Sequence, residues 1–338
     1  MAKVAVVTGA TAGVGRATAV ELAGRGYDVA LLARGRAGLD GACAEVESEG
    51  VRALALPTDV ARFDEVDAAA ARVENELGPI DLWVNNAMTT YFAPSWEVEP
   101  ADFQRAVEVT FLGQVWGTRA ALDRMRPRDS GAIVDVGSAL AFIGIPLQSA
   151  YCASKFACRG YFESTRAELI HEGSRVRMSM VHLPAMNTPQ FDWCATDVDR
   201  HPQPVPPIYE PELAARLIAD VAEDGRRSKT LGSWNTFLVS AAQLAPGFAN
   251  QFAARGAWES QLTEEPIDPS RPANLHCPAD DAEDHGAHGS FDDRSGGFFD
   301  PAYLKTLPTT AWTFARASAG LVKETGRVWS RRISAARR

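Results

Sequence analysis

The sequence predicts an α/β fold in which helices cover both faces of one doubly wound parallel sheet. Short apolar segments alternate with longer segments of helical periodicity up to residue 181. A glycine-rich turn follows the first apolar segment, and polar or turn-forming residues follow the ends of later ones, namely Asp59, Asn86, Ser138 and Pro184. Strands and helices in this alternation form parallel βαβ units, and such sheets bind ligands beyond the carboxyl ends of their strands.

The first half of the chain contains four predicted strands. Each is an apolar run bounded by glycine, proline or polar residues, and they are residues 3–8, 27–33, 51–56 and 80–84. Helical segments separate them, at residues 16–25, from about 35 to about 48, and at 63–77. Gly26 ends the first helix and Gly78-Pro79 ends the third, because neither residue type continues a helix well.

The second half begins with the same alternation and then loosens. Further strands are predicted at residues 132–136, running into Ser138, and at 176–181, with helices at 101–126, 151–166 and 212–223. Residues 188–211 are rich in proline and aromatic side chains, which favours an ordered flap. Residues 234–258 are apolar around Pro246-Gly247 and predict two short helices that meet at a bend.

Bulk composition excludes several classes of protein. The 338 residues are 46% hydrophobic, which suffices for one large domain with an extension. A net charge of -9 argues against a general nucleic-acid binder, and no apolar run is long enough to span a bilayer. The N-terminus enters a strand at once, which leaves no signal peptide, and the five cysteines are scattered without pair spacing. We therefore expect a reduced, cytoplasmic protein.

Three residues after the fifth strand have the chemistry of a proton-transfer site. Tyr151 and Lys155 lie four apart in a predicted helix, so the phenol and the ammonium share one helix face. A neighbouring cation stabilises the charged form of a phenol, which lets the phenol give or take a proton near neutral pH. Ser138 can position the substrate oxygen. Alone, the Tyr-x-x-x-Lys spacing is also common on exposed helices.

The glycine-rich turn predicts a dinucleotide site. Thr8 to Gly15 reads Thr-Gly-Ala-Thr-Ala-Gly-Val-Gly and stands between the first strand and the first helix. Backbone amides at a helix N-terminus can receive a pyrophosphate, and glycines let the ligand approach the backbone. A tight structural turn is the alternative, but the strand–turn–helix context favours the nucleotide.

With this loop, Asn85-Asn86-Ala87, Ser138 and Tyr151-x-x-x-Lys155 in order, the chain resembles the short-chain dehydrogenase/reductase superfamily. The resemblance is close from Val4 to about Val181 and looser to about Gly232. It implies a Rossmann-type sheet, a nicotinamide cofactor, Tyr151 as catalytic acid/base, Lys155 on the nicotinamide ribose and Ser138 on the substrate carbonyl. The implied cofactor-binding residues are Gly9, Thr11, Gly13, Val14, Gly15, Arg34, Asp59, Val60, Asn86, Ala87, Tyr151, Lys155, Pro184 and Thr188.

The residues after the second strand predict NADP(H) rather than NAD(H). Dinucleotide folds that select NAD place an acid there for the ribose hydroxyl, and an arginine accommodates the 2′-phosphate. Ala33 stands where the acid is expected, Arg34 and Arg36 follow, and Arg16 adds positive charge beside the glycine turn. Alternatively, Arg34 and Arg36 are solvated loop charges. Asp59 would accept from the adenine amino group, or it caps a turn.

Several positions depart from the family pattern. Thr110 stands where the family usually carries an asparagine that supports a water chain from the lysine, partly through its backbone carbonyl. Thr110 keeps the carbonyl and changes the side chain. Met88 and Ala185 replace usual glycines, and Thr188 follows Pro184 one residue sooner than usual.

The expected substrate is a small apolar ketone, aldehyde or secondary alcohol. Apolar side chains concentrate in the loops that set specificity in this family; these are Tyr91, Phe92, Trp96, Leu140, Phe142, Ile143, Ile145, Phe191 and Trp193. No arginine cluster marks a carboxylate or phosphate on the substrate. Two rivals are a sensor or scaffold that holds NADP without turnover, and a membrane-peripheral interaction protein.

The chain is therefore expected to have two parts. Residues 1–245 form the NADP-binding and catalytic domain, with the substrate flap at about 188–211, and residues 246–338 form a C-terminal extension. Its acidic loop, residues 264–293, reads as irregular, and its histidines lack a recognised zinc spacing, so we expect no metal. On a helix, Trp312, Ala315, Ala319, Val322, Trp329 and Ile333 form an apolar stripe beside basic residues. We expect this helix to dock on the protein or on a second subunit of a homo-oligomer; the alternative is an anionic membrane.

Overall fold

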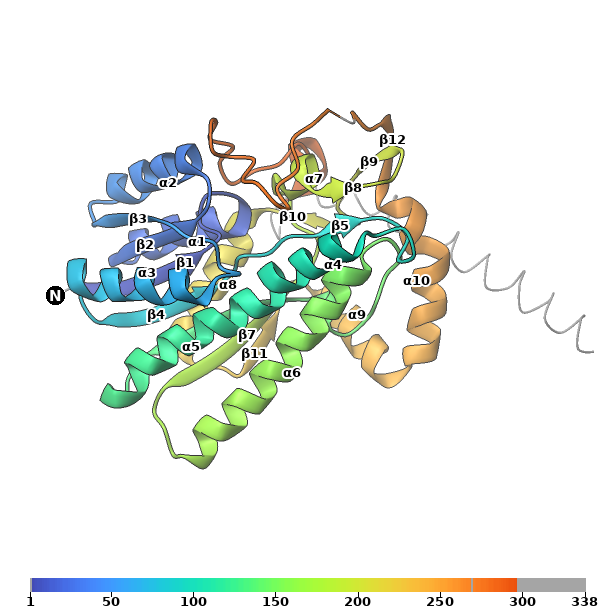
Figure 1. Ribbon diagram of the computed structural model, residues 1–338. Helices are drawn as coiled ribbons and strands as arrows, with labels where there is room; N and C mark the ends of the chain where they lie inside the picture. Colours follow the sequence, from blue (N-terminus) through green and yellow to red (C-terminus); the bar gives the residue numbers. More distant parts are fainter. Residues whose placement is uncertain (1, 269, 297–338) are drawn as a thin grey trace, which may run out of the picture.

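A computed structural model of the protein describes residues 2–268 and 270–296 (Figure 1). Its centre is a sheet of seven parallel strands in the order β11-β7-β6-β4-β1-β2-β3. The strands are β1 (Lys3–Thr8), β2 (Tyr27–Ala33), β3 (Ala53–Pro57), β4 (Ile80–Asn85), β6 (Ala132–Ser138), β7 (Arg177–Leu183) and β11 (Ser228–Thr230). The predicted doubly wound parallel sheet is confirmed. The sequence did not predict β11, because its residues form no apolar run.

Helices cover both faces of the sheet, as predicted. One face carries α1 (Gly13–Gly24), α2 (Arg36–Ser48) and α8 (Pro211–Asp224), and the other carries α3 (Phe63–Glu76), α5 (Gly113–Met125) and α6 (Ser149–His171). Side chains of β1 alternate between the two: Ala5 and Val7 pack in the first core, and Val4 and Val6 in the second. Burial on both faces explains why the strands are nearly continuous apolar runs.

The predicted helix at residues 101–126 is divided into three segments. These are α4 (Pro100–Val107), a π-helical turn η1 (Glu108–Leu112) and α5. Single π turns inside helices occur often at functional sites, and this one contains Thr110. Hydrophobic periodicity did not distinguish it, because one extra residue in a turn barely changes an apolar pattern.

The winding of the chain places a crevice beside β1. From β1 the strands step outward through β2 to β3, and the chain then returns to β4 on the other side of β1. The strand order thus reverses between β1 and β4. Loops that leave two neighbouring strands in opposite directions open a crevice at their carboxyl ends, where open α/β sheets bind ligands.

The flap and the extension are joined by small sheets. The flap contains α7 (Gln190–Trp193), β8 (Ala195–Thr196), β9 (Arg200–Pro202) and β10 (Ile208–Tyr209). The two predicted helices around the Pro246 bend are α9 (Ser233–Leu244) and α10 (Pro246–Ser260). Strand β12 (Leu262–Pro266) pairs with β9, β13 (Ser295–Gly296) pairs with β10, and β5 (Tyr91–Phe92) pairs with β8. The remaining short turns are η2 (Arg126–Arg128), η3 (Ala139–Ala141) and η4 (Asp292–Arg294).

Between β12 and η4 the extension runs without regular structure across the carboxyl ends of the strands; it is the dark orange segment at the top of Figure 1, between α2 and α7. This agrees with the irregular acidic loop expected from the sequence. The predicted amphipathic helix with its apolar stripe lies outside the described residues, and the domain division at residue 245 stays a prediction. In the two described ranges, no helix is long and apolar enough to cross a membrane.

Candidate active site

The structure brings the three predicted catalytic side chains to one cavity of about 430 Å³. Ser138 is the last residue of β6, and Tyr151 and Lys155 are in the first two turns of α6. All three line the cavity at the carboxyl end of the sheet. Their common position follows from the topology, because α6 begins just beyond the end of β6.

Hydrogen bonds fix the serine and the lysine of this group. Lys155 is buried, its Nζ donates to the Val136 carbonyl at 2.7 Å, and it lies 5.6 Å from the centre of the Tyr151 ring. Ser138 Oγ accepts from the Leu140 amide at 3.1 Å. Accepting this bond leaves the hydroxyl proton of Ser138 available for a substrate oxygen.

Thr110 lies behind the catalytic group rather than in the cavity wall. Its hydroxyl accepts from the Thr89 amide at 3.0 Å and donates to the Thr89 carbonyl at 2.8 Å. Its carbonyl accepts from the Cys158 thiol at 3.3 Å. The hydroxyl therefore joins the π turn to the loop after β4, and a water chain from Lys155 could use only the carbonyl, which the thiol already contacts.

A buried carboxyl group lies beneath the lysine. Asp135 on β6 is fully buried; its Oδ1 accepts from Asn85 Nδ2 at 2.8 Å, and its Oδ2 has no hydrogen-bond partner among the described residues. Burial raises the pKa of Asp135 to about 7, although the Asn85 hydrogen bond and the charge of Lys155 act in the other direction. Sequence reasoning missed this residue, which looks like one more position of a buried strand.

The glycine turn has the shape that a pyrophosphate needs. Gly9 and Gly13 adopt positive φ angles of 64° and 57°, which other residues rarely adopt. A Cβ at Gly15 would overlap the Gly9 carbonyl, so Gly15 allows α1 to pack closely on the turn. Gly9, Thr11, Gly13 and Val14 line the cavity, whereas Gly15 acts through this packing. The turn therefore fits a bound dinucleotide on its own geometry.

The residues after β4 are built against this turn. Asn86 Nδ2 donates to the Thr8 and Gly9 carbonyls at 3.0 and 3.2 Å, and the amides of Asn86 and Ala87 donate to Thr8 Oγ1. Asn86 and Ala87 both line the cavity, as do Val60, Pro184 and Thr188. The structure therefore gathers nearly all of the predicted cofactor-binding residues around one space.

Asp59 reaches the cavity wall as one half of an ion pair. Its Oδ1 accepts from the Ala61 amide at 3.1 Å, which is the turn-capping alternative, and its Oδ2 accepts from Arg105 at 2.7 Å. Arg105 also donates to the Leu275 carbonyl of the extension. The pair thus fixes the extension to the edge of the candidate adenine site.

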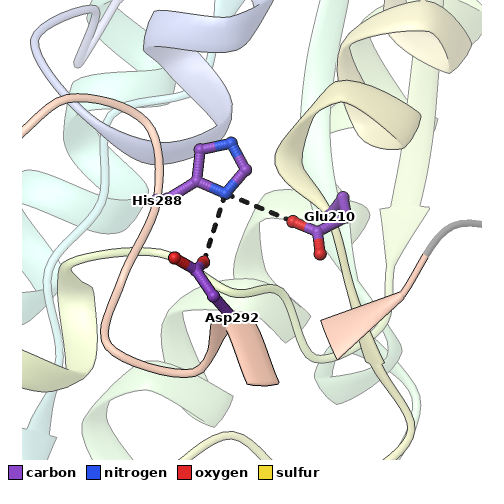
Figure 2. Close-up of side chains that lie close together, drawn as sticks. All are labelled: Glu210, His288 and Asp292. Atoms are coloured by element: carbon purple, nitrogen blue, oxygen red, sulfur yellow. Dashed lines mark ion pairs between the residues drawn. The ribbon is translucent and has the colours of Figure 1, made fainter. Parts of the chain in front are cut away.

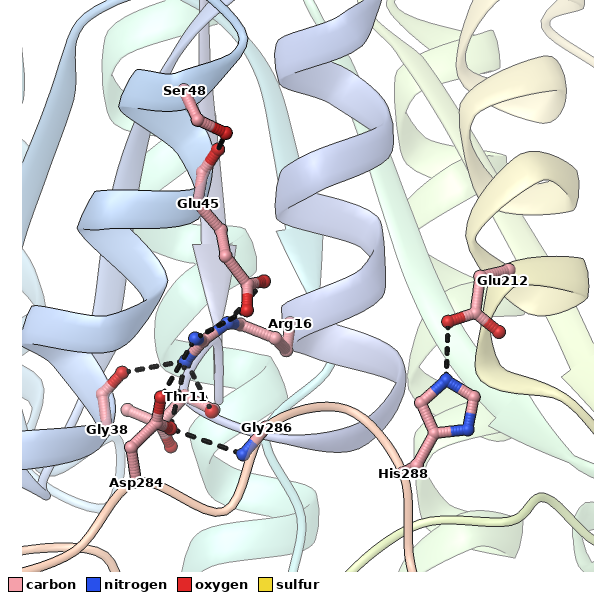
Figure 3. A network of polar contacts seen from close by, with 9 residues as sticks. All are labelled: Thr11, Arg16, Gly38, Glu45, Ser48, Glu212, Asp284, Gly286 and His288. Atoms are coloured by element: carbon pink, nitrogen blue, oxygen red, sulfur yellow. Dashed lines mark hydrogen bonds and ion pairs between the residues drawn. The ribbon is translucent and has the colours of Figure 1, made fainter. Parts of the chain in front are cut away.

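Arg16 does not supply the free positive charge that we expected beside the glycine turn. It is 1% exposed, and it pairs with Glu45 at 2.9 Å and with Asp284 of the extension at 3.0 Å (Figure 3). It also donates to the carbonyls of Thr11 and Gly38. Two carboxylates neutralise this guanidinium, so its role is to join α1, α2 and the extension.

Arg34 lines the cavity, but it is not a solvated loop charge. Its guanidinium donates to the backbone carbonyls of Asn274, Leu275 and His276. These bonds use three of its five N–H groups, and the other two have no hydrogen-bond partner among the described residues. Burial lowers the pKa of Arg34, and the nearby charge of Arg105 lowers it further. The sequence could not show that the extension returns to hold this residue.

An acid from a distant part of the chain lies near the end of β2, although Ala33 itself carries none. Asp280 of the extension lines the same cavity, and a Cβ at either Gly35 or Gly38 would collide with its carboxylate. The side chain comes from a segment that is more than 240 residues away along the chain. Sequence reasoning grouped Asp280 with an acidic loop, since composition alone does not show where such a loop folds.

The other half of the cavity is mostly apolar, with a few polar side chains such as Gln148 and Asn235. Of the nine side chains expected there, six line it: Phe92, Leu140, Ile143, Ile145, Phe191 and Trp193. Trp96 is instead 81% exposed, Tyr91 donates to Asp197 at 2.6 Å, and Phe142 packs on His182. Helices α9 and α10 add apolar residues that were not predicted, namely Trp234, Leu238, Phe252, Ala253 and Ala257.

His288 of the extension lies among carboxylates at the start of α8. Its Nδ1 is 3.2 Å from Glu210 and 3.5 Å from Asp292 (Figure 2). Its Nε2 is 2.8 Å from Glu212 (Figure 3). Burial lowers the pKa of His288, but the Glu212 hydrogen bond and the surrounding negative charges outweigh it and raise the pKa above its ordinary value. Glu210, His288 and Asp292 are close enough to share a metal ion. The same distances suit a protonated imidazole that ties the extension to α8.

Comparison with known proteins agrees with this geometry. A family model described as short chain dehydrogenase matches residues 3–197. The Bacillus subtilis (strain 168) oxidoreductase YxnA is 30% identical over 311 residues, which cover 91% of this chain and 87% of that protein. The 3-dehydrosphinganine reductase of Danio rerio is 31% identical over 238 residues, covering 67% of this chain and 70% of that protein.

A solved structure of similar fold carries a nucleotide. It is a metagenomic short-chain oxidoreductase in complex with NADP, with a TM-score of 0.57 and 28% identity, covering 68% of this chain and 95% of that chain. The family match extends over more than half of the sequence, and the match to YxnA continues into the extension. This chain is a member of the short-chain dehydrogenase/reductase family, an NAD(P)-dependent oxidoreductase by its family.

Proposed function

We propose that the protein transfers hydride between NADP(H) and an apolar ketone, aldehyde or secondary alcohol. One observation carries this proposal: Ser138, Tyr151 and Lys155 share a single cavity with the glycine turn, and the remaining wall of that cavity is mostly apolar. A site built only to hold a nucleotide would have no use for a phenol, an ammonium and a serine hydroxyl at the far end of the same space.

Each of the three side chains has a distinct task in the proposed reaction. Ser138, whose Oγ already accepts from Leu140, donates its proton to the substrate oxygen and orients the carbonyl. Tyr151 gives its phenolic proton to that oxygen during reduction and removes it during oxidation. Lys155 stabilises the phenolate that remains, while the Val136 carbonyl holds its ammonium in place. The bound nicotinamide supplies or accepts the hydride.

The preference for NADP(H) rests on Arg34. This guanidinium lines the cavity near the end of β2 and keeps two N–H groups that could donate hydrogen bonds to a 2′-phosphate. The NADP complex of the related metagenomic oxidoreductase supports the same assignment. Because three carbonyls already hold the guanidinium, little side-chain entropy is lost when it binds a phosphate.

The apolar wall sets the proposed substrate class. Flap, loop and α9–α10 side chains surround the far end of the cavity, and apolar lining favours a hydrocarbon substituent over a sugar. A relative is named a 3-dehydrosphinganine reductase, which supports reduction as one direction of the reaction.

The test is a panel of ketones and aldehydes of increasing alkyl length, with sugars as polar comparison, followed by absorbance of the reduced nicotinamide. We expect kcat/KM to rise with alkyl length, by about tenfold for every two methylenes that enter the apolar region. Binding of NADPH without turnover of any carbonyl compound would instead support a sensor.

A matched pair on α9 locates the substrate. Leu238 lines the cavity, and Leu244 on the same helix is 87% exposed. Leu238→Gln should raise KM for long-chain ketones, whereas Leu244→Gln should leave it unchanged. Equal kinetics in the two variants would place the substrate elsewhere.

A further inference from the structure

The extension completes the wall of the candidate adenosine site. Asn274, Pro278, Ala279 and Asp280 line the same cavity as the glycine turn. The segment is held from several sides: Arg34 binds carbonyls 274–276, Arg105 binds the Leu275 carbonyl at 3.2 Å, and His276 contacts Asp102 at 2.6 Å. These contacts place it as a fixed part of the site.

Residues 280 and 281 also cap helix α2. The N-cap residue of α2 is Gly35, which has no side chain to satisfy the first amides of the helix. The Asp280 carbonyl accepts from the Gly38 amide at 3.0 Å, the Asp281 carbonyl accepts from Ala37 at 3.3 Å, and Asp281 Oδ1 accepts from Arg36 at 3.2 Å. The backbone at Asp280 is therefore fixed without using its carboxylate.

That carboxylate is buried and has no hydrogen bond or ion pair within residues 2–268 and 270–296. Asp280 is 7% exposed and borders the cavity, where Gly35 and Gly38, which have no side chains, leave space for its carboxylate. A buried carboxylate needs donors, because an unpaired one costs free energy. Its position at the cavity wall means that a ligand can supply them.

We infer that Asp280 is a cofactor-specificity residue that accepts hydrogen bonds from the adenosine ribose hydroxyls. This rests on the proposed nucleotide site. The carboxylate lies beside Gly35 and Gly38, just after β2, where α/β dinucleotide folds bring the ribose, and Ala33 supplies no acid. The C-terminal extension thus provides the group that β2 lacks.

Asp280 and Arg34 act in opposite directions on cofactor choice. A free 2′-hydroxyl can donate to the carboxylate, whereas a 2′-phosphate is repelled by it and attracted by the guanidinium. Both side chains border the same cavity, and the negative charge of Asp280 acts on Arg34. The preference for NADP(H) from Arg34 is therefore reduced by Asp280, and NADH should bind measurably.

The test measures binding of fragments that contain only the adenosine half, so it does not depend on turnover. Adenosine 5′-monophosphate and adenosine 2′,5′-bisphosphate are titrated calorimetrically into the full-length parent and three variants. Asp280→Ala should weaken binding of the monophosphate and strengthen binding of the bisphosphate. The ratio of the two dissociation constants should change by about tenfold or more. Asp280→Asn keeps a hydrogen-bond acceptor, so it should bind the monophosphate as the parent does and bind the bisphosphate more tightly.

Asp281→Asn is the matched control. It removes the same charge one residue away, on an exposed side chain that keeps its Oδ1 acceptor for the Arg36 amide, and it should change the ratio less than twofold. Equal weakening of both fragments in Asp280→Ala, or an unchanged ratio, would overturn the inference. If neither fragment bound the parent, that result would instead contradict the nucleotide site itself.

Discussion

The ammonium of Lys155 lies 5.6 Å from the centre of the Tyr151 ring while it donates to the Val136 carbonyl at 2.7 Å. The lysine is thus fixed between the end of β6 and the phenol, in a buried position. A cation held here stabilises a phenolate without having to be reorganised during the reaction. This relationship is the structural basis for proposing that the two residues act as a pair.

Lys155→Met should therefore lower kcat by about 10²–10⁴-fold, because the phenolate loses its neighbouring cation. Lys155→Arg keeps a cation at this position and should retain more of the activity than the methionine variant. Steady-state kinetics of the two folded variants check both effects. A kcat in Lys155→Met within tenfold of the parent value would show that the ammonium is not needed beside Tyr151.

Thr110 should matter for stability rather than for proton transfer, because both of its hydroxyl hydrogen bonds go to Thr89. Thr110→Val loses two hydrogen bonds and should cost about 1–3 kcal/mol in the free energy of unfolding. Thr110→Ser keeps them and should match the parent. Denaturant unfolding measures the free energy of unfolding of each variant. The pH profile of kcat shows whether proton transfer is affected. A shifted profile in the valine variant alone would show that the hydroxyl takes part in the reaction.

Asp135 predicts a specific pH dependence of stability. Burial raises its pKa to about 7, so the folded state keeps a proton that the unfolded chain releases near pH 4. The contribution of protonated Asp135 to the free energy of unfolding is fully present below about pH 4 and is lost as the pH rises to about 7. It amounts to roughly 4 kcal/mol at most by linkage.

Asp135→Asn removes this ionisation and keeps an oxygen for Asn85. Its unfolding midpoint should exceed that of the parent at about pH 8, and the difference should shrink toward pH 5. Asp40→Asn, an exposed residue of α2, serves as control and should show no such trend. The idea fails if parent and Asp135→Asn lose stability equally as the pH rises.

Arg34→Ala should weaken binding of NADPH by about ten- to hundredfold and binding of NADH far less. The reason is that a charge-assisted hydrogen bond to the 2′-phosphate contributes about 1.5–3 kcal/mol. Arg36→Ala removes an exposed charge two residues away and should change neither constant. Fluorescence titration of both cofactors measures the effect. Equal loss of NADPH and NADH would mean that Arg34 only anchors residues 274–276.

The main domain and most of its site followed from the sequence because their signals are local. Alternating apolar runs and helices identify parallel strands, and the residues that follow those strands meet at one edge of the sheet. The sequence therefore predicted that four residues lie near one another at this edge, namely Gly9, Asn86, Ser138 and Tyr151. The π turn around Thr110 could not be predicted, since it changes hydrogen bonding more than hydrophobic pattern.

What the sequence did not reveal depends on long-range folding of the extension. Asp280, Asp284 and Gly286 contact residues 13–38, and nothing in an acidic, Gly-rich stretch specifies that return. The same return explains why Arg16 is neutralised and why Arg34 is held. Buried Asp135 was missed for a different reason. Its properties come from complete burial, and a strand pattern does not distinguish a buried aspartate from a solvent-exposed one.

The most direct test of the account compares the parent with Tyr151→Phe, using NADPH and a ketone that the parent reduces. The variant should lose turnover by about 10²–10⁴-fold or more, because only the proton donor is removed. Its dissociation constant for NADPH should stay within about twofold of the parent value. A variant that binds NADPH normally and still reduces the ketone within tenfold of the parent rate would contradict Tyr151 as the catalytic acid.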